Sequence, residues 1–105
     1  MKGKKYRRVV TYKDFFKEFF KIQSIAVQKK IVWTLELIED IEQVPETYLK
    51  HLSGTDGLYE VKVGLGSNTF RIFCFFSGEQ IIVLMNSFQK KTNKTPKSEI
   101  VKALK

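Results

Sequence analysis

Residues 58–63 read Leu-Tyr-Glu-Val-Lys-Val and residues 69–76 read Thr-Phe-Arg-Ile-Phe-Cys-Phe-Phe, and these two stretches decide the fold. In the first, a Tyr-Val-Val set alternates with a set that includes Glu60 and Lys62, which is the period of two expected of a β-strand. The second is apolar at nearly every position, which is typical of a central strand. Residues 64–68, Gly-Leu-Gly-Ser-Asn, have the composition of a turn. The sequence therefore predicts an antiparallel hairpin here.

Two further segments extend the predicted sheet. Residues 80–86 are again apolar on both faces and follow a second turn at residues 77–79, Ser-Gly-Glu. Residues 6–12 contain the β-branched run Val-Val-Thr and suit a first strand.

Helical spacing occupies the region between residues 14 and 52. Four phenylalanines at positions 15, 16, 19 and 20 fall on one side of a short helix. Ser24 can cap a longer helix, whose apolar stripe consists of Val27, Ile31, Leu35, Ile38 and Ile41. Pro45 fits the end of that helix, and residues 48–52 are predicted to add one more turn.

A last short helix is predicted to begin at Thr95-Pro96 and to run to Leu104. The resulting order is β-α-α-β-β-β-α. We therefore expect an α+β fold in which two N-terminal helices pack on one face of a small antiparallel sheet, in a single domain spanning residues 1–105.

The net charge of +8 is distributed unevenly along the 105 residues. Residues 1–13 carry a charge of +6, residues 14–60 carry −4, and residues 61–105 carry +6. This distribution favours a molecule with one face for a polyanion, and nucleic acid is the first candidate, because Lys and Arg displace condensed counterions from phosphate. The alternative is a lysine-rich surface that serves only solubility.

Several classes of function are disfavoured by composition. A hydrophobic fraction of 43% is too high for a disordered chain. No apolar run approaches the ~18 residues of a membrane span, and the basic N-terminus lacks the apolar segment of a secretory signal, so a cytoplasmic protein is expected. Cys74 and His51 are the only residues of their types, so we expect no disulfide, no zinc site and no cofactor.

Arg71 is the one charge in its aromatic strand, and two explanations for it remain open. A buried guanidinium without a partner would cost several kcal/mol. It therefore needs either a bound anion, such as a phosphate, or an ion pair with Glu60 on the neighbouring strand. Lys62 lies on the polar side of that strand. The basic run 88–97 leaves the last strand and is placed to fold across the same face.

Three segments resemble the RelE/ParE superfamily of toxins from type II toxin–antitoxin systems, and in particular its phage-derived, HigB-like branch. They are residues 57–63, residues 70–73 and residues 83–96, the last of which contains Phe-Gln-Lys-Lys-Thr-Asn-Lys-Thr-Pro. The resemblance implies a fold like that of microbial ribonucleases. It also implies a metal-independent endoribonuclease (mRNA interferase) that cleaves mRNA on the ribosome, inhibits translation, and is neutralised by a HigA-like antitoxin with a helix-turn-helix domain.

The resemblance also assigns residues. Arg71 matches the arginine of the family's aromatic-Arg strand, and Lys62 stands where relatives carry arginine, which keeps the charge but loses the planar fork. Phe88 and Gln89 occupy the neighbourhood where many relatives carry a Tyr or His acid or base. The predicted catalytic residues are Lys62, Arg71, Lys90 and Lys91, and the predicted RNA-binding residues are Arg7, Arg8, Gln89, Lys94 and Lys97.

The departure at Phe88 and Gln89 leaves two other functions open. The first is a non-catalytic inhibitor of DNA gyrase, as on the ParE side of the superfamily. The second is an inactive member that only binds its partner or DNA.

Three other residues have side chains that occur in functional sites, namely His51, Cys74 and Trp33. His51 is expected on the surface, and Cys74 in the core. Trp33 lies off the apolar stripe of the long helix, so we expect it to pack against the first helix or the antitoxin in preference to stacking on a base.

Overall fold

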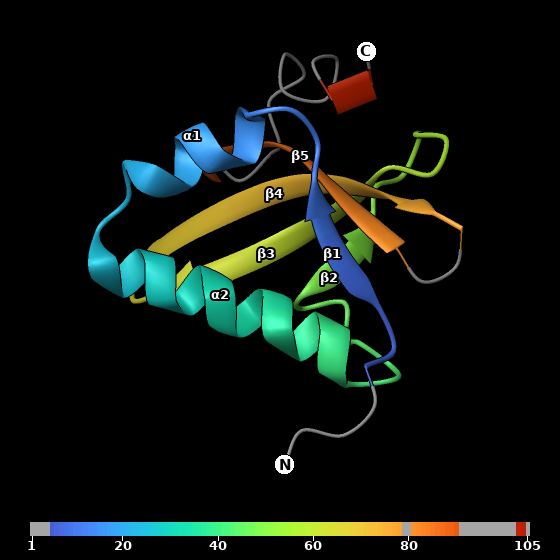
Figure 1. The fold of residues 1–105 in the computed structure, drawn as a ribbon, viewed down its shortest axis with the longest axis horizontal. Helices are drawn as coiled ribbons and strands as arrows, with labels where there is room; N and C mark the ends of the chain where they lie inside the picture. The colour runs from blue at the N-terminus through green and yellow to red at the C-terminus, as the bar shows by residue number, and fades with distance from the viewer. Residues whose placement is uncertain (1–4, 79–80, 91–102, 105) are drawn as a thin grey trace.

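The computed structural model describes residues 5–78, 81–90 and 103–104 (Figure 1). The predicted run 91–97 and most of the predicted C-terminal helix lie outside these residues. The elements are β1 (Arg8–Thr11), α1 (Phe15–Lys21), α2 (Ile25–Asp40), β2 (Leu49–His51), β3 (Tyr59–Leu65), β4 (Asn68–Ser77) and β5 (Ile81–Lys90).

The five strands form one sheet in the order β1-β5-β4-β3-β2. Adjacent strands are antiparallel except β1 and β5, which pair in parallel from Arg8 opposite Ile81 to Thr11 opposite Leu84. The α+β class is confirmed, but the prediction of a wholly antiparallel sheet was wrong. A parallel pair needs a long crossover connection, and here that connection is the whole chain from α1 to β4. Side-chain alternation is the same for either direction, so the pattern of β1 could not reveal it.

Two segments differ from their predicted conformations. Residues 49–51 form strand β2, paired with β3 at Leu49 opposite Val61, where one more helical turn was predicted. The edge of β3 offers backbone partners that a single isolated turn does not. Strand β5 also continues past residue 86 to Lys90, because β4 is long enough to pair with all of it. Phe88 and Gln89 therefore belong to the sheet.

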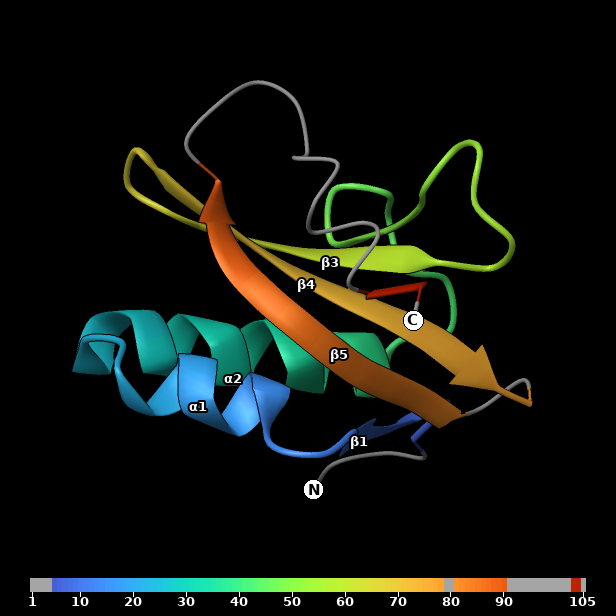
Figure 2. The same ribbon diagram turned by 90° about the horizontal axis from the view of Figure 1, so that it is seen from above.

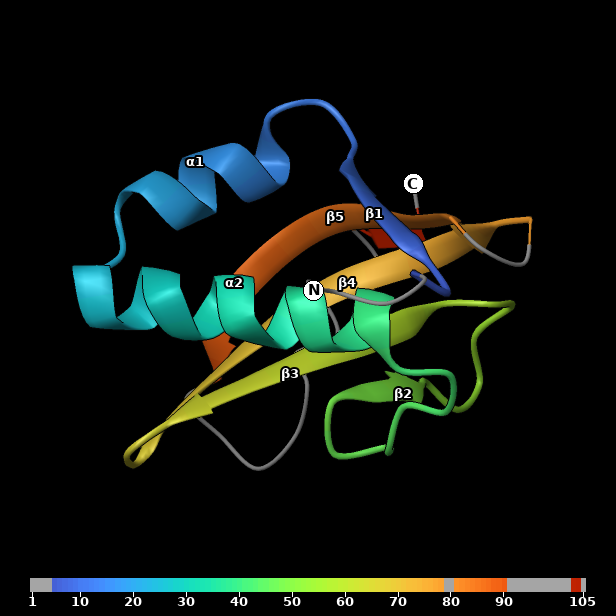
Figure 3. The same ribbon diagram turned by 60° about the horizontal axis from the view of Figure 1, so that its bottom comes forward.

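Both helices cover one face of the sheet, as predicted (Figures 2 and 3). The predicted cap is present, since the Ser24 hydroxyl accepts a hydrogen bond from the Val27 amide at 3.3 Å. Along α2 the buried residues are Val27, Ile31, Thr34 and Ile38. Thr34 can be buried because its hydroxyl donates to the Lys30 carbonyl at 2.8 Å, which satisfies the polar group inside the helix.

The main hydrophobic core lies between the helices and the sheet. Its buried members are Phe16, Val27, Ile31, Ile38, Leu49, Val61, Val63, Phe70, Ile72, Cys74, Ile82 and Leu84. As predicted, Cys74 is a core thiol, and burial followed by the nearby charge of Glu60 raises its pKa from 9.0 to about 12. The thiol therefore stays neutral and unreactive at physiological pH.

The opposite face of the sheet carries a second, smaller cluster. Leu58, Phe73, Met85 and Ala103 are buried there, with Val83 and Phe88 packed against them. The two clusters coexist because the register between β4 and β5 shifts between Ile72 and Cys74. This irregularity places both Met85 and Phe88 on the same side as Phe73, although their residue numbers differ in parity.

Arg7 ties the N-terminal segment to the end of α2. Its guanidinium donates to three backbone carbonyls, those of Ile38 at 3.1 Å, Ile41 at 2.7 Å and Glu42 at 2.6 Å. Ile38 lies in the last turn of α2, where carbonyls lack intrahelical partners, and Ile41 and Glu42 directly follow the helix. A cation is favoured at this end of a helix by the helix dipole. Glu39 adds a further link by accepting from the Val9 amide at 2.9 Å.

We expect Arg7→Gln to lower the free energy of unfolding by about 1.5–3 kcal/mol, the range for hydrogen bonds made by a charged group. Arg8→Gln is the matched control, since Arg8 is exposed and should change stability by less than about 0.5 kcal/mol. Urea denaturation of both variants measures the difference. Equal stability of the two would contradict the capping function assigned to Arg7.

Candidate nucleic-acid interface

Lys62, Arg71 and Phe88 form a row across three adjacent strands on the face away from the helices. Lys62 is opposite Arg71 in the pairing of β3 with β4, and Arg71 is opposite Phe88 in the pairing of β4 with β5. Directly opposed residues of a sheet project from the same face. Lys62 is exposed, whereas Arg71 and Phe88 are partly buried. The structure thus brings together two of the four residues predicted as catalytic.

Arg71 forms an ion pair with Glu60, in which Nη1 donates to the carboxylate Oε1. The contact runs diagonally across the sheet, since Glu60 is opposite Phe73. Both side chains are well shielded, with 12% of Arg71 and 2% of Glu60 exposed. The sequence left open whether Arg71 binds an anion or pairs with Glu60, and the structure contains the ion pair with Glu60.

The ion pair leaves part of the guanidinium available. Arginine has five N–H donors, and among the described residues the buried Nε of Arg71 has no hydrogen-bond partner. The buried hydroxyl of Ser87 on β5 is likewise without one. The Arg71 Nε is shielded from solvent, so an anion that approaches from the solvent side would meet the exposed 12% of the side chain, whose orientation is already fixed by the carboxylate.

Apolar packing surrounds this pair on the sheet. Phe73 is fully buried and stacks at a tilt against Phe88, with the ring centroids 5.5 Å apart. Asn86, also buried, lies on β5 beside them. Low local polarity strengthens charge interactions, so a phosphate placed here would interact with Arg71 more strongly than at an open surface. Lys62, at the exposed end of the row, would add a second positive charge.

The other predicted residues are distributed differently. Gln89 is exposed and its Nε2 donates to Asn68 Oδ1 at 3.2 Å. Lys90 is the last residue of β5, paired with Thr69, and Arg8 is exposed on β1. Lys91, Lys94 and Lys97 lie outside the described residues. Arg7 is occupied by the end of α2, so we do not retain it among the RNA contacts.

Asn86 and Ser87 interrupt the apolar strand β5. Ser87 is opposite Ile72 of the helix-side core, so it projects from the other face of the sheet than Arg71. Trp33 contacts Tyr48 edge to face, with the ring centroids 6.0 Å apart, and the Nζ of Lys30 lies 4.2 Å from its ring centroid. His51 is exposed, as predicted, with its ring against Tyr59.

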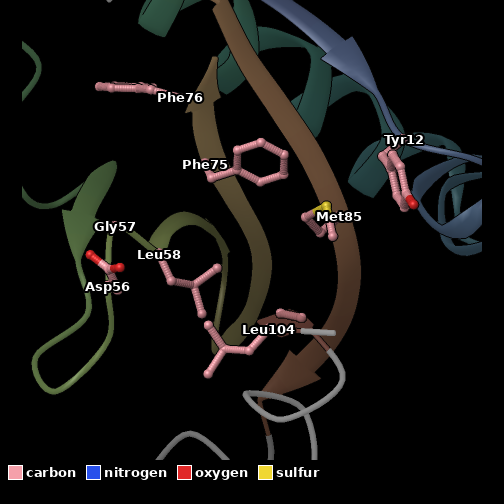
Figure 4. A pocket seen from close by; sticks show the side chains of 9 residues that line it. Tyr12, Asp56, Gly57, Leu58, Phe75, Phe76, Met85 and Leu104 are labelled. Carbon is pink, nitrogen blue, oxygen red and sulfur yellow. The ribbon is translucent and has the colours of Figure 1, made fainter. Parts of the chain in front are cut away.

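A pocket of about 440 Å³ lies further along the same face (Figure 4). Leu58, Phe75 and Met85 project toward the same hollow, and Asp56 is at its rim. The described residues that line it include no lysine or arginine. It is therefore less suited to phosphate than the row of Lys62 and Arg71.

Two helices on one face of a five-stranded mixed sheet, with an exposed and a paired cation on the other, define a RelE-like α+β protein. Residues 18–105 match the family described as Phage derived protein Gp49-like (DUF891), and the chain belongs to this family. It is a RelE-type toxin family associated with toxin–antitoxin systems, which implies an antitoxin partner. No curated protein matches the chain. In the described part of the chain, every helix is too short or too polar to cross a bilayer.

We expect Arg71→Ala to lower the free energy of unfolding by about 3–5 kcal/mol, because it removes the guanidinium partner of a buried carboxylate. The double variant Arg71→Met/Glu60→Leu should recover most of that loss, since it removes both charges together. Chemical denaturation of each variant makes the comparison. Lys62→Gln is the control, because Lys62 is exposed and should change stability by less than about 0.5 kcal/mol. Wild-type stability of Arg71→Ala would refute the structural importance of the pair.

Proposed function

We propose that this protein is the toxin of a HigB-like toxin–antitoxin pair and acts as a ribosome-dependent, metal-independent mRNA endoribonuclease. The observation that carries the proposal is the row on the exposed sheet face, in which Arg71 is oriented by Glu60 and Lys62 lies beside it. Membership of a RelE-like toxin family supports it independently. The proposed partners are mRNA, the ribosome and a HigA-like antitoxin with a helix-turn-helix domain.

The proposed reaction is attack of the ribose 2′-oxygen on the adjacent phosphorus. The O2′–P bond forms, the P–O5′ bond breaks, the 2′-hydroxyl proton leaves to a base, and the 5′-oxygen gains a proton. Negative charge develops on the phosphate oxygens, so a pre-oriented cation stabilises the transition state more than the ground state. We assign that function to Arg71 and Lys62.

Proton donation to the 5′-oxygen is assigned to Lys90, the last residue of β5, or to Lys91, the next residue in the sequence. Clustered positive charge lowers the pKa of a lysine and so makes it a better acid. Arg8, Lys94 and Lys97 are proposed to contact RNA phosphates around this centre. Gln89 is opposite Phe70 of the helix-side core and projects from the other face of the sheet, so it is not retained among these contacts. We assign no described residue as the general base.

A second function, non-catalytic inhibition of DNA gyrase, is favoured by one observation. Phe88 occupies the third position of the row, beside Arg71, and packs against Phe73. A phenyl ring transfers no proton, so the row itself lacks an acid or base at the position next to the guanidinium. Binding without chemistry would be compatible with that arrangement.

Lys62 is the cleanest test of the catalytic proposal, because its exposure separates activity from stability. Lys62→Ala should lower the rate of mRNA cleavage on translating ribosomes by about 100-fold, the scale for one lost transition-state donor. Lys62→Arg should retain most of the activity because the charge remains. Primer extension on an mRNA translated in a purified system measures the cleavage.

The products and the alternative can be checked on the same samples. The 5′ fragments should end in a 2′,3′-cyclic phosphate or a 3′-phosphate, as 2′-oxygen attack requires. A 3′-hydroxyl end would contradict this mechanism. Intact mRNA together with loss of gyrase supercoiling activity would support the gyrase function instead.

A further inference from the structure

A smaller pocket of about 200 Å³ lies at the edge of the sheet next to Lys62. It is lined by Lys30, Thr34, Thr47, Tyr48, Lys62 and Gly64. Strand β2 pairs only with residues 59–61, so the edge of β3 beyond them has no neighbouring strand among the described residues. Helix α2 packs on β3 (Figure 3), and the pocket draws its lining from α2, from residues 47 and 48, and from β3.

The chemistry of this pocket suits an anion. Its described lining residues include two lysines and three hydroxyl-bearing side chains, and no carboxylate. The Thr34 hydroxyl already donates to the Lys30 carbonyl, whereas Thr47 is exposed. Two lysines and hydroxyl-bearing residues that line one hollow, with no carboxylate among them, suit the binding of a phosphate.

An exposed aromatic ring adjoins the pocket. Trp33 is 46% exposed, and the helical spacing of residues 30, 33 and 34 places it on the same side of α2 as the pocket-lining Lys30 and Thr34. The ring is held by its edge-to-face contact with Tyr48, and Tyr48 is itself fixed because its carbonyl accepts from the Lys62 amide at 3.0 Å. A large ring held in place at a surface is a platform for a nucleobase.

Lys62 joins this pocket to the row that contains Arg71. It lines the pocket and is also the residue directly opposite Arg71. The positive charges therefore continue from the sheet face around its edge to α2. A single-stranded polyanion that reaches Arg71 can follow these charges without crossing an acidic lining residue of the pocket.

We propose that Lys30, Trp33, Tyr48 and Lys62 bind a second nucleotide of the RNA strand whose scissile phosphate lies at Arg71. The two lysines contact its phosphate, and the exposed part of Trp33 stacks on its base. This inference rests on the proposed function. Trp33 also borders a groove in which apolar residues lie beside Gln28, Lys29 and Glu36, so contact with the antitoxin is the competing use of the ring. The lysines and hydroxyls favour RNA.

The test uses the intrinsic fluorescence of the wild-type protein, because Trp33 is the only tryptophan in the chain. A 2′-O-methyl RNA oligonucleotide, which lacks the attacking 2′-hydroxyl, is titrated at low salt, and its own anisotropy reports binding separately. We expect saturation of binding to quench Trp33 emission. Trp33→Leu and Lys30→Gln should each weaken binding by about tenfold, and Trp33→Phe should retain most of the affinity.

Lys29→Gln is the matched control, since it removes the same charge from the neighbouring exposed position of α2, outside the pocket. It should weaken binding by less than about threefold, as expected for loss of one non-specific charge. Unchanged Trp33 emission at saturation, or wild-type affinity of both Trp33→Leu and Lys30→Gln, would overturn the inference. The inference would also be overturned if Trp33→Leu and Lys30→Gln weakened antitoxin binding and left RNA binding unchanged.

The outcome is separable from that of the proposed function. Quenching of Trp33 by RNA in a protein that leaves translated mRNA intact would retain the nucleotide pocket and reject the nuclease. If the wild type cleaves mRNA and Trp33→Leu binds and cleaves RNA as well as the wild type does, the nuclease is retained and the nucleotide pocket is rejected.

Discussion

The ion pair of Arg71 with Glu60 is the constraint on which the exposed face of the sheet depends. Two charges shielded from water are tolerated only when they are paired, so neither residue can be changed alone without cost. The pairing also determines what the face can bind. The carboxylate holds the guanidinium in one orientation, while the Nε remains without a partner among the described residues. Arg71 therefore serves both the stability of the fold and the proposed chemistry, so a change at Arg71 alters both. A change at the exposed Lys62 reports on activity alone.

The helices, the register shift in the sheet and the contacts of Arg7 hold the sheet face that carries Arg71 in place. Helices α1 and α2 bury one side of the sheet, and the row of Lys62 and Arg71 lies on the other. The register shift between β4 and β5 brings Phe88 beside Arg71 and completes a small apolar cluster around the pair. Arg7 caps α2 and keeps the N-terminal strand at the far edge. Arg7 therefore stabilises the fold, whereas the side chain of Lys62 remains exposed and available to a ligand.

The positions of β3 and α2 and the importance of Arg71 could be predicted from the sequence, because each is indicated by a local sequence pattern. Period-two alternation located β3, helical spacing and Ser24 located α2, and the lone arginine in an aromatic strand marked Arg71. The parallel pairing of β1, the strand at residues 49–51 and the extension of β5 to Lys90 could not be predicted, since each depends on a partner distant in sequence. The same holds for Arg7, whose partners lie more than 30 residues away, and for the pocket that joins Lys30 to Lys62. The roles of Lys90, Lys91, Lys94 and Lys97 stay predictions.

We propose that RNA phosphate binds at the ion-paired Arg71. Guanidinium ¹⁵N NMR tests it most directly, because Arg7, Arg8 and Arg71 are the only arginines of the chain and Arg7 provides an internal structural reference. On titration with the 2′-O-methyl oligonucleotide, we expect the Nε and Nη signals of Arg71 to shift and their protons to exchange more slowly with water, while the signals of Arg7 stay unchanged. Arg71 signals that remain unaltered at saturating RNA would contradict it.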